Sequence, residues 1–130
     1  MILVVCIANN NGIMFNKRRV SKDALLIERL KSKIGKNKIY LSNYSKELFD
    51  DFNNITHNIE DIKETDFYFL EDEEIPNLKI NEIIVYKWNR DYPADKFWEL
   101  SLNEYTLISE EDFAGNSHER ITEIIYTKEN

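Results

Sequence analysis

The sequence predicts an α/β fold with a mainly parallel central sheet, helices on both faces and an antiparallel pair of strands at its C-terminal end. Three observations support this fold class. Apolar segments of strand length alternate with helical patterns over residues 1–88, residues 104–128 show period-two alternation without a helix, and 130 residues suffice for one hydrophobic core but not for two. We therefore expect a single domain spanning residues 1–130.

The first expected strand covers about residues 1–8, whose sequence is MILVVCIA. No basic residue precedes this apolar run and no small-residue cleavage site follows it, so the pattern is that of a buried strand and not of a secretion signal. It contains the single cysteine, Cys6, which excludes an internal disulfide and favours a reducing compartment. No apolar run approaches the roughly 20 residues of a membrane-spanning helix. We expect a cytoplasmic protein with no membrane partner.

A helix is expected next, between Ser21 and Gly35. Ser21 is the expected N-cap because its hydroxyl can accept a free amide of the first turn, and Gly35 is the expected C-cap because glycine adopts left-handed conformations. The buried face is defined by apolar residues at helical spacing, namely Ile27, Leu30 and Ile34. Asp23 lies four residues before Ile27 on that face, where a carboxylate is unexpected.

The remaining elements continue the same alternation. The expected segments are a second strand at 37–42 (NKIYLS), a short helix within 43–52, a third strand at 66–71 (DFYFLE) and a fourth at 80–88 (INEIIVYKW). Continuous apolar strands of this kind are typical of a parallel sheet covered on both faces. Residues 104–113 and 118–128 are the expected antiparallel pair, and the acidic run at 71–74 is expected to be a turn or the start of a helix.

Charge is distributed unevenly along the chain, whose net charge is −7. Residues 17–38 contain nine Lys or Arg against two acidic residues, a local charge of +7, so the rest of the chain carries −14. The acidic total makes nucleic acid an unfavourable partner. The later lysines of this segment fit the negative end of a helix dipole, whereas Arg18 and Arg19 precede the helix, where the dipole favours acidic residues. Two explanations remain open for this pair: contact with an acidic loop, or binding of an anion.

The order of elements resembles that of the dihydrofolate reductase family in shortened form. The resemblance is carried by four stretches: MILVVCIANNNGIM, SKDALLIERLKSKIGKNKIYLSNYSKELF, DFYFLEDEEIPNLKINEIIVYKW and YPADKFWELSLNEYTLISEEDFAGNSHERITEIIYTK. Together they cover nearly every element of the chain. The resemblance implies a dihydrofolate reductase-like fold in which the first stretch ends at the start of the mobile active-site loop. It also implies a helical turn between the two strands of the third stretch.

The same resemblance gives a role to Asp23, the catalytic candidate. In the family, the first helix presents one carboxylate into the folate pocket, where it binds the pterin ring and assists protonation, and Asp23 falls at that position. A carboxylate in a cleft of low dielectric is also suited to hydrogen bonding and proton transfer. The alternative is an aspartate that the helix dipole favours in the first turn and that faces solvent.

The cofactor side departs from the family pattern. Where the resemblance implies a Gly-Gly pair that lets the dinucleotide pyrophosphate approach, this chain has Glu71 and Asp72, whose side chains and charges oppose phosphate. The family's phosphate-binding arginine and threonine correspond to Asn43 and Ser45, and its threonine that supports the pocket carboxylate falls near Lys96. We therefore expect no cofactor, with NADPH as the disfavoured alternative, and no ordinary NADPH-dependent folate reduction.

Ligands of open parallel sheets bind beyond the carboxyl ends of the strands. The candidate ligand-binding residues near that edge are Arg18, Arg19, Asn43, Trp88, Asn89, Arg90, Ser117 and His118. Trp88 beside Arg90 could stack on and clamp a planar anion, or Trp88 could simply pack in the core. His118 could bind a ligand or tether its loop. Ser117 and His118 are not expected to form a nucleophile–base pair, because neighbours on an extended strand point to opposite faces.

The stretch GIMFNKRRVSKD is similar to small bacterial proteins labelled ribonuclease Z. That activity requires two zinc ions held by a dense cluster of histidine and aspartate side chains, whereas this chain has only His57 and His118, far apart in sequence. We expect no metal site and expect the ribonuclease Z label to be wrong for this chemistry.

Three functional hypotheses follow. The favoured one is a divergent dihydrofolate reductase-like protein that binds a small planar or anionic ligand at the carboxyl rim of the sheet without ordinary folate reduction. The second is an NADPH-dependent reductase of a pterin or nucleotide-like substrate. The third is a partner-binding protein whose basic rim docks an acidic surface, or a metal-independent nuclease that uses Arg18, Arg19 and His118. Whether the protein is an enzyme is left open by the sequence.

Overall fold

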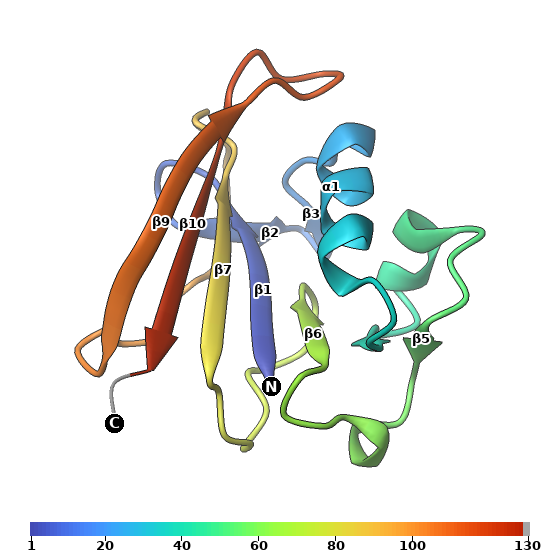
Figure 1. Cartoon of the computed structure of the whole chain (residues 1–130). Helices are drawn as coiled ribbons and strands as arrows, with labels where there is room; N and C mark the ends of the chain where they lie inside the picture. The colour runs from blue at the N-terminus through green and yellow to red at the C-terminus, as the bar shows by residue number, and fades with distance from the viewer. Residues whose placement is uncertain (129–130) are drawn as a thin grey trace.

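A seven-stranded mixed sheet runs through the computed structural model, which describes residues 1–128 (Figure 1). Its strands, in spatial order, are β5 (Ile55–Thr56), β4 (Ile39–Tyr40), β6 (Phe67–Leu70), β1 (Ile2–Ile7), β7 (Glu82–Lys87), β10 (Ile121–Lys128) and β9 (Tyr105–Phe113). The five strands from β5 to β7 are parallel, and β10 is antiparallel to both β7 and β9. The predicted α/β fold class and the antiparallel closing pair are therefore confirmed.

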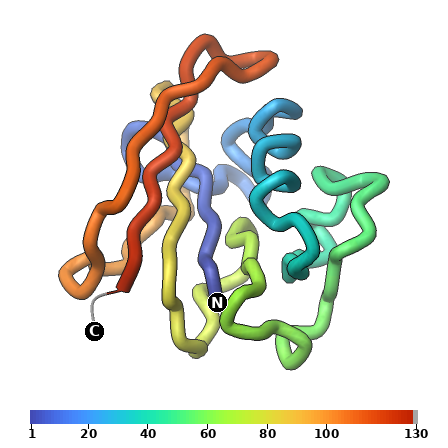
Figure 2. Tube along the Cα trace, viewed as in Figure 1, coloured from blue at the N-terminus to red at the C-terminus, as the bar shows by residue number. Residues whose placement is uncertain are grey.

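Within residues 1–128, the other elements are one α-helix, two short 3-10 helices and a second, small sheet (Figure 1). Figure 2 shows the path of the chain through these elements. The helices are α1 (Ala24–Ile34), η1 (Ser45–Phe49) and η2 (Ile59–Asp61). The small sheet consists of β3 (Arg18–Arg19), β2 (Gly12–Phe15) and β8 (Lys96–Phe97). The sequence did not predict this sheet, because its strands are too short to show a periodic pattern. None of the helices within residues 1–128 is long and apolar enough to cross a membrane.

Helix α1 begins at Asp23 and ends at Gly35. The Asp23 carboxylate accepts hydrogen bonds from the backbone amides of Leu25 (3.0 Å) and Leu26 (3.3 Å), so Asp23 is the N-cap. The prediction that Ser21 caps the helix is wrong, because the chain turns into the helix two residues later and the Ser21 hydroxyl bonds elsewhere. The C-cap prediction is confirmed: Gly35 has a φ of 55° and its amide donates to the Lys31 carbonyl.

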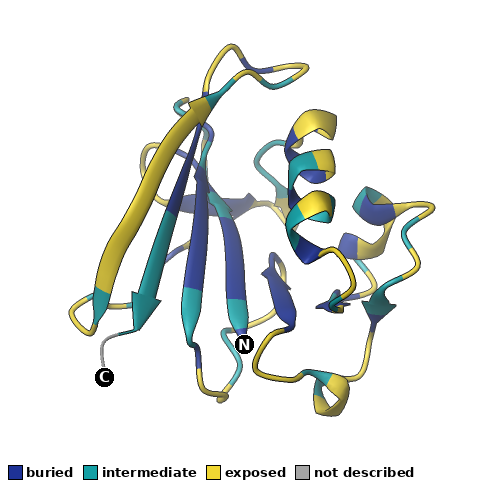
Figure 3. Ribbon diagram, viewed as in Figure 1, coloured by how far each residue is buried: buried dark blue, intermediate teal, exposed yellow. Residues whose placement is uncertain are grey.

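Apolar side chains fill both faces of the sheet, and alternate residues of β1 supply the two cores (Figure 3). Helix α1 covers one face with four buried residues, namely Leu26, Ile27, Leu30 and Ile34. The other face is covered by β2, by the loops before β7 and β9 and, through Ile59, by the short 3-10 helix η2. Within residues 1–128 the one α-helix thus lies on a single face, and the other face has only this 3-10 helix. The connection from β6 to β7 consists of bends without regular secondary structure, so the helical turn expected there does not form. It contains Pro76, which has no backbone N–H to donate to a helical hydrogen bond.

A buried ion-pair network ties α1 to the antiparallel end of the sheet. Glu123 on β10 is 2% exposed and accepts hydrogen bonds from Arg29 Nε (2.8 Å) and from the Tyr86 hydroxyl (2.9 Å), with Lys33 Nζ 3.3 Å away. Burial by itself would raise the pKa of Glu123, but the hydrogen bonds from Arg29 and Tyr86 lower it. Arg29 also reaches Glu111 on β9. The charged face of α1 is therefore used to hold the helix on the sheet.

We expect the Arg29→Ala variant to lose about 3 kcal/mol of unfolding free energy, because it leaves the buried Glu123 carboxylate with weaker compensation. The matched control is Arg120→Ala, which removes an exposed ion pair with Asp112 and should cost less than about 1 kcal/mol. Urea denaturation of the two variants and the wild type measures both values. Equal losses for the two variants would contradict the structural role given to Arg29.

Candidate functional site

Three segments meet at one end of the molecule, beyond the carboxyl ends of β1 and β7 (Figure 1). They are the N-terminal end of α1, the residues that follow β7, and the loop from Ala114 to Arg120 that connects β9 to β10 and reaches across to the helix. Several of the candidate residues lie here. The loop joins the helix through the Asp23 side chain.

Asp23 is 3% exposed and its carboxylate is surrounded by donors from the protein. Besides the two helix amides, Oδ1 accepts the Asn116 amide (3.1 Å), and Oδ2 accepts the Ser117 amide (3.0 Å), the Ser117 hydroxyl (3.4 Å) and His118 Nδ1 (2.9 Å). Burial by itself would raise the pKa of Asp23, but the hydrogen bonds from His118 and from the amides of Ser117, Asn116 and Leu26 lower it to about 2. The residue is ionised at neutral pH and fully hydrogen-bonded inside the protein.

The loop backbone lies directly against this carboxylate at Gly115. A Cβ atom added to Gly115 would lie 2.2 Å from Asp23 Oδ2, so no larger residue fits without moving the loop. The Gly115 amide donates to the His118 carbonyl (2.9 Å), which closes the turn around the carboxylate. Glycine is therefore required here by close approach.

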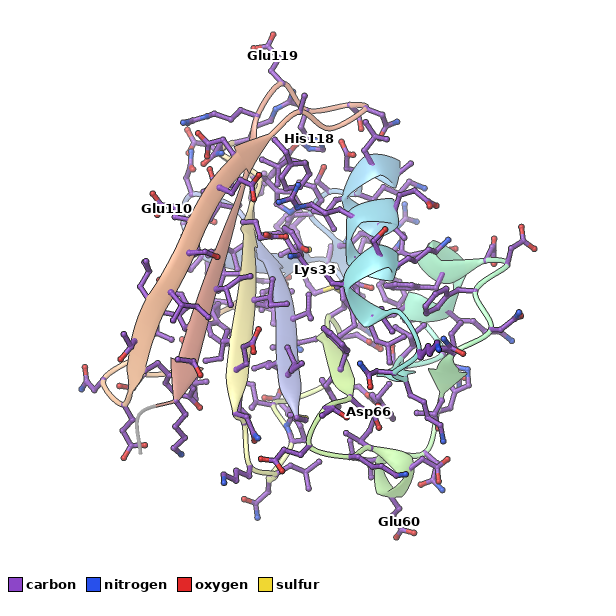
Figure 4. All side chains as sticks on the ribbon, in the orientation of Figure 1. Lys33, Glu60, Asp66, Glu110, His118 and Glu119 are labelled. Atoms are coloured by element: carbon purple, nitrogen blue, oxygen red, sulfur yellow. The ribbon has the colours of Figure 1, made fainter. Side chains whose placement is uncertain are left out.

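His118 occupies the centre of the site, beneath this loop and next to the N-terminal end of α1 (Figure 4). Its ring stacks on Trp88, with centroids 4.6 Å apart and an interplanar angle of 27°. Its Nε2 atom lies 2.9 Å from the Ser21 hydroxyl and 3.4 Å from the Tyr92 hydroxyl. Because an ionised carboxylate only accepts hydrogen bonds, Nδ1 carries a proton toward Asp23. In the tautomer with its only proton on Nδ1, Nε2 is an acceptor for the Ser21 hydroxyl.

Sequence reasoning missed Ser21 and Tyr92 as members of this site. Ser21 was assigned to helix capping, and the only serine considered beside His118 was Ser117. No short motif connects residues separated by 97 positions, so no sequence signal marked Ser21 as the partner of His118.

The other candidates on this side are held by the β9–β10 connection. The Arg90 guanidinium donates to the Ser117 carbonyl (3.2 Å), which joins the segment after β7 to the same loop. Asn89 has a φ of 59° and its side-chain amide donates to the Arg120 carbonyl and to the Thr122 hydroxyl. The structure thus brings together Asp23, Trp88, Arg90, Ser117 and His118, with Asn89 beside them.

Arg19 belongs to a different cluster, at the carboxyl end of β6. It forms a salt bridge with buried Glu71 (2.9 Å) and another with Glu47 (2.6 Å), and its guanidinium lies 4.3 Å from the centre of the Tyr44 ring. The Ser45 hydroxyl also donates to Glu71 (2.7 Å). Of the two explanations for the arginine pair, contact with an acidic loop therefore holds for Arg19.

Among residues 1–128, the side chains of Arg18 and Asn43 make no hydrogen bond or ion pair with either cluster. Arg18 is exposed on β3 and lines a shallow groove of about 350 Å³ together with Phe15, Tyr92 and Pro93. Asn43 is exposed after β4. The structure therefore does not gather all of the predicted ligand-binding residues around one cavity.

A second groove of about 310 Å³ lies between α1, η1 and the Asn116–Ser117 turn. Its apolar lining comes from Ala24, Ile27 and Leu48, and its polar lining consists of Lys22, Asp23, Glu28, Lys31, Glu47, Asn116 and Ser117. This volume is at the lower end of the range of small-molecule pockets, roughly 300–1,000 Å³. Among residues 1–128, no group of three or more His, Cys, Asp or Glu side chains is placed to hold a metal ion.

The sheet order, with the site at the carboxyl ends of its parallel strands, defines a dihydrofolate reductase-like fold. A solved structure, dihydrofolate reductase from Enterococcus faecalis complexed with NADP(H) and RAB-propyl, matches with a TM-score of 0.69. The match covers 99% of this chain and 96% of that chain at 10% sequence identity, so the likeness is one of fold. No protein-family model matches the sequence, and no curated protein matches it.

We expect the stability of the protein to fall as the pH is lowered from about 4 to 2. The folded-state pKa of Asp23 is below its ordinary value of 3.8, so its stabilisation is present above that value and is lost as the pH falls through about 2. The Asp23→Asn variant should lose roughly 2 kcal/mol at pH 7, and its deficit should shrink at pH 2. Denaturation curves at both pH values measure this difference, with Asp91→Asn, at an exposed position, as the control. A deficit independent of pH would contradict the role of the charge.

Proposed function

We propose that this dihydrofolate reductase-like protein binds a small planar or anionic ligand at the carboxyl rim of the sheet and does not catalyse ordinary NADPH-dependent folate reduction. The observation that carries the proposal is the enclosure of Asp23. Its two oxygens already accept six hydrogen bonds from the protein. A carboxylate that binds a pterin ring needs free acceptor positions facing a cavity, and these are occupied here.

The residues on the cofactor side do not fit a dinucleotide phosphate. Glu71 and Asp72 follow β6, where backbone amides would have to approach the phosphates. Glu71 is fixed by Arg19, and Asp72 accepts the Ser42 hydroxyl at 2.6 Å, so both carboxylates are held in place. The arginine nearest to this point is already neutralised by two glutamates. These contacts favour a function without NADPH.

The groove between α1 and η1 is the proposed ligand site. Ala24, Ile27 and Leu48 offer an apolar surface to a flat ligand. Three of the charged side chains that line the groove are already paired: Lys31 forms an ion pair with Glu28, and Glu47 forms one with Arg19 outside the groove. Lys22 forms no ion pair with any residue of the described chain, 1–128, and remains available for an anionic group. A small aromatic carboxylate or phosphate has the matching chemistry.

We expect NADPH to leave the melting temperature unchanged and to give no heat in calorimetry, because Glu71 and Asp72 repel phosphate. The dihydrofolate reductase from Enterococcus faecalis, measured under the same conditions, is the positive control. Micromolar NADPH binding together with dihydrofolate-dependent oxidation of NADPH would refute the proposal.

A thermal-shift screen of folates, nucleotides and small aromatic carboxylates should identify compounds that stabilise the wild type. For such a compound, the Ala24→Phe variant should bind at least about tenfold more weakly, because the added ring fills the groove. The ligand-induced rise in melting temperature should be correspondingly smaller. Leu25→Phe is the matched control: it lies in the same helical turn, is exposed, and does not line the groove. Equal affinities in the two variants would place binding elsewhere, and a screen without any stabilising compound would count against the ligand-binding proposal.

A further inference from the structure

Ser21, His118 and Asp23 form a continuous chain of hydrogen bonds, and the proposed binding function gives no role to the Ser21 end of this chain. Ser21 Oγ lies 2.9 Å from His118 Nε2, and His118 Nδ1 lies 2.9 Å from Asp23 Oδ2. We propose that this chain is a nucleophilic relay in which Ser21 attacks small carboxylic esters, so that the protein has esterase activity. The relay meets the proposed ligand groove only at Asp23, because neither Ser21 nor His118 lines that groove.

The order of donors and acceptors suits Ser21 as the nucleophile, His118 as the general base and the Asp23 carboxylate as the group that orients the base. The Asp23 carboxylate fixes the proton on Nδ1, which leaves the lone pair of Nε2 facing the Ser21 hydroxyl. The histidine can then take the serine proton, and the ionised aspartate stabilises the imidazolium that forms. Both distances lie within hydrogen-bond reach without any movement of the protein.

Exposure differs between the two ends of the relay. The side chains of His118 and Asp23 are 2% and 0% exposed, and stacking on Trp88 fixes the plane of the imidazole. Ser21 is partly exposed and is the member of the relay nearest to solvent. The imidazole is therefore held rigidly, and water and substrate meet the relay at its Ser21 end.

Donors for the negative charge on a tetrahedral intermediate lie near Ser21. The Tyr92 hydroxyl is 3.3 Å from Ser21 Oγ and can transfer its hydrogen bond to the carbonyl oxygen of a substrate. Within residues 1–128, the backbone amides of Ser21 and Lys22 donate to no protein acceptor. Tyr92 and these two amides are the candidate oxyanion donors.

The groove next to Ser21 indicates the kind of ester. Val20 precedes Ser21 and Tyr92 contacts it, and both line the groove of about 350 Å³. The rest of its lining is Phe15, Asn16, Pro93, exposed Arg18 and Arg19, whose charge is already paired with Glu47 and Glu71. Ser21 adjoins this groove and is not part of its lining. Apolar walls and one exposed cation favour a small ester with an apolar group and a negative charge at the opposite end.

The proposed reaction is hydrolysis and uses only water as co-reactant. Ser21 Oγ bonds to the carbonyl carbon while its proton passes to His118 Nε2, and the same proton then passes to the departing alkoxide, which leaves as the alcohol. Water attacks the acyl-serine as His118 takes its proton, and the serine oxygen recovers that proton when the carboxylic acid leaves. No oxidation or reduction occurs.

The test uses the full chain with p-nitrophenyl acetate and with a fluorophosphonate probe, which reacts with activated serines. We expect catalysed release of nitrophenol and one probe molecule per chain, located on Ser21 by mass spectrometry of peptides. Ser21→Ala should abolish the labelling and lower the hydrolysis rate at least about 100-fold. Tyr92→Phe should lower kcat without a comparable rise in KM, because its hydroxyl acts on the transition state.

Ser109→Ala is the matched control, because Ser109 is exposed on β9 and far in the fold from His118. It should keep both the wild-type hydrolysis rate and the labelling. Unfolding curves of all variants check that the fold is intact. The proposal is overturned if the wild type neither hydrolyses the ester nor takes up the probe, if the probe reacts elsewhere, or if Ser21→Ala hydrolyses the ester as fast as Ser109→Ala.

Discussion

The buried carboxylate of Asp23 is the interaction on which the rest of the site depends. It caps α1, holds the turn at Asn116 and Ser117 against the helix, and fixes the orientation of His118. A buried charge is tolerated only when several donors compensate its loss of hydration, and the helix and the β9–β10 loop supply these donors from opposite ends of the sequence. The ionised state of Asp23 therefore depends on the packing of the β9–β10 loop against α1, which brings these donors together.

The same principle explains the uneven charge of the chain. Two of the acidic side chains buried outside this site are paired with basic side chains of segment 17–38: Arg19 with Glu71, and Arg29 and Lys33 with Glu123. The third, Asp66, accepts hydrogen bonds from the backbone amides of Lys38 and Lys63. Within residues 1–128, four of the nine basic residues of this segment form ion pairs, and these four include both arginines that hold buried glutamates. The other five, among them Lys22 and Arg18, form no ion pair with any residue of that range. A high local charge in the sequence is for this reason a poor measure of the charge presented to partners.

The fold is determined by apolar side chains in the two cores, whereas the chemistry of the site is determined by polar residues at the strand ends. The likeness to a solved dihydrofolate reductase extends over 99% of the chain although only 10% of residues are identical, because many apolar side chains can fill the same two cores. The polar residues at the strand ends are under no such constraint. The salt bridge of Arg19 with Glu71 and the enclosure of Asp23 give this edge a chemistry of its own, which is the reason to derive function from the site and not from the fold.

The sequence by itself determined the main strands, the end of α1 at Gly35 and the antiparallel closing pair, because each of these depends on local periodicity or on conformational preference. It also placed Asp23 on the apolar face of the helix, but left open whether its side chain is buried or faces solvent. Only the tertiary structure decided that Asp23 and not Ser21 caps the helix, that loops cover the second face of the sheet, and that Ser21 contacts His118. These outcomes depend on contacts between residues up to 97 positions apart, such as Ser21 and His118. Such contacts leave no periodic signal, since they are fixed by the packing of whole elements against one another.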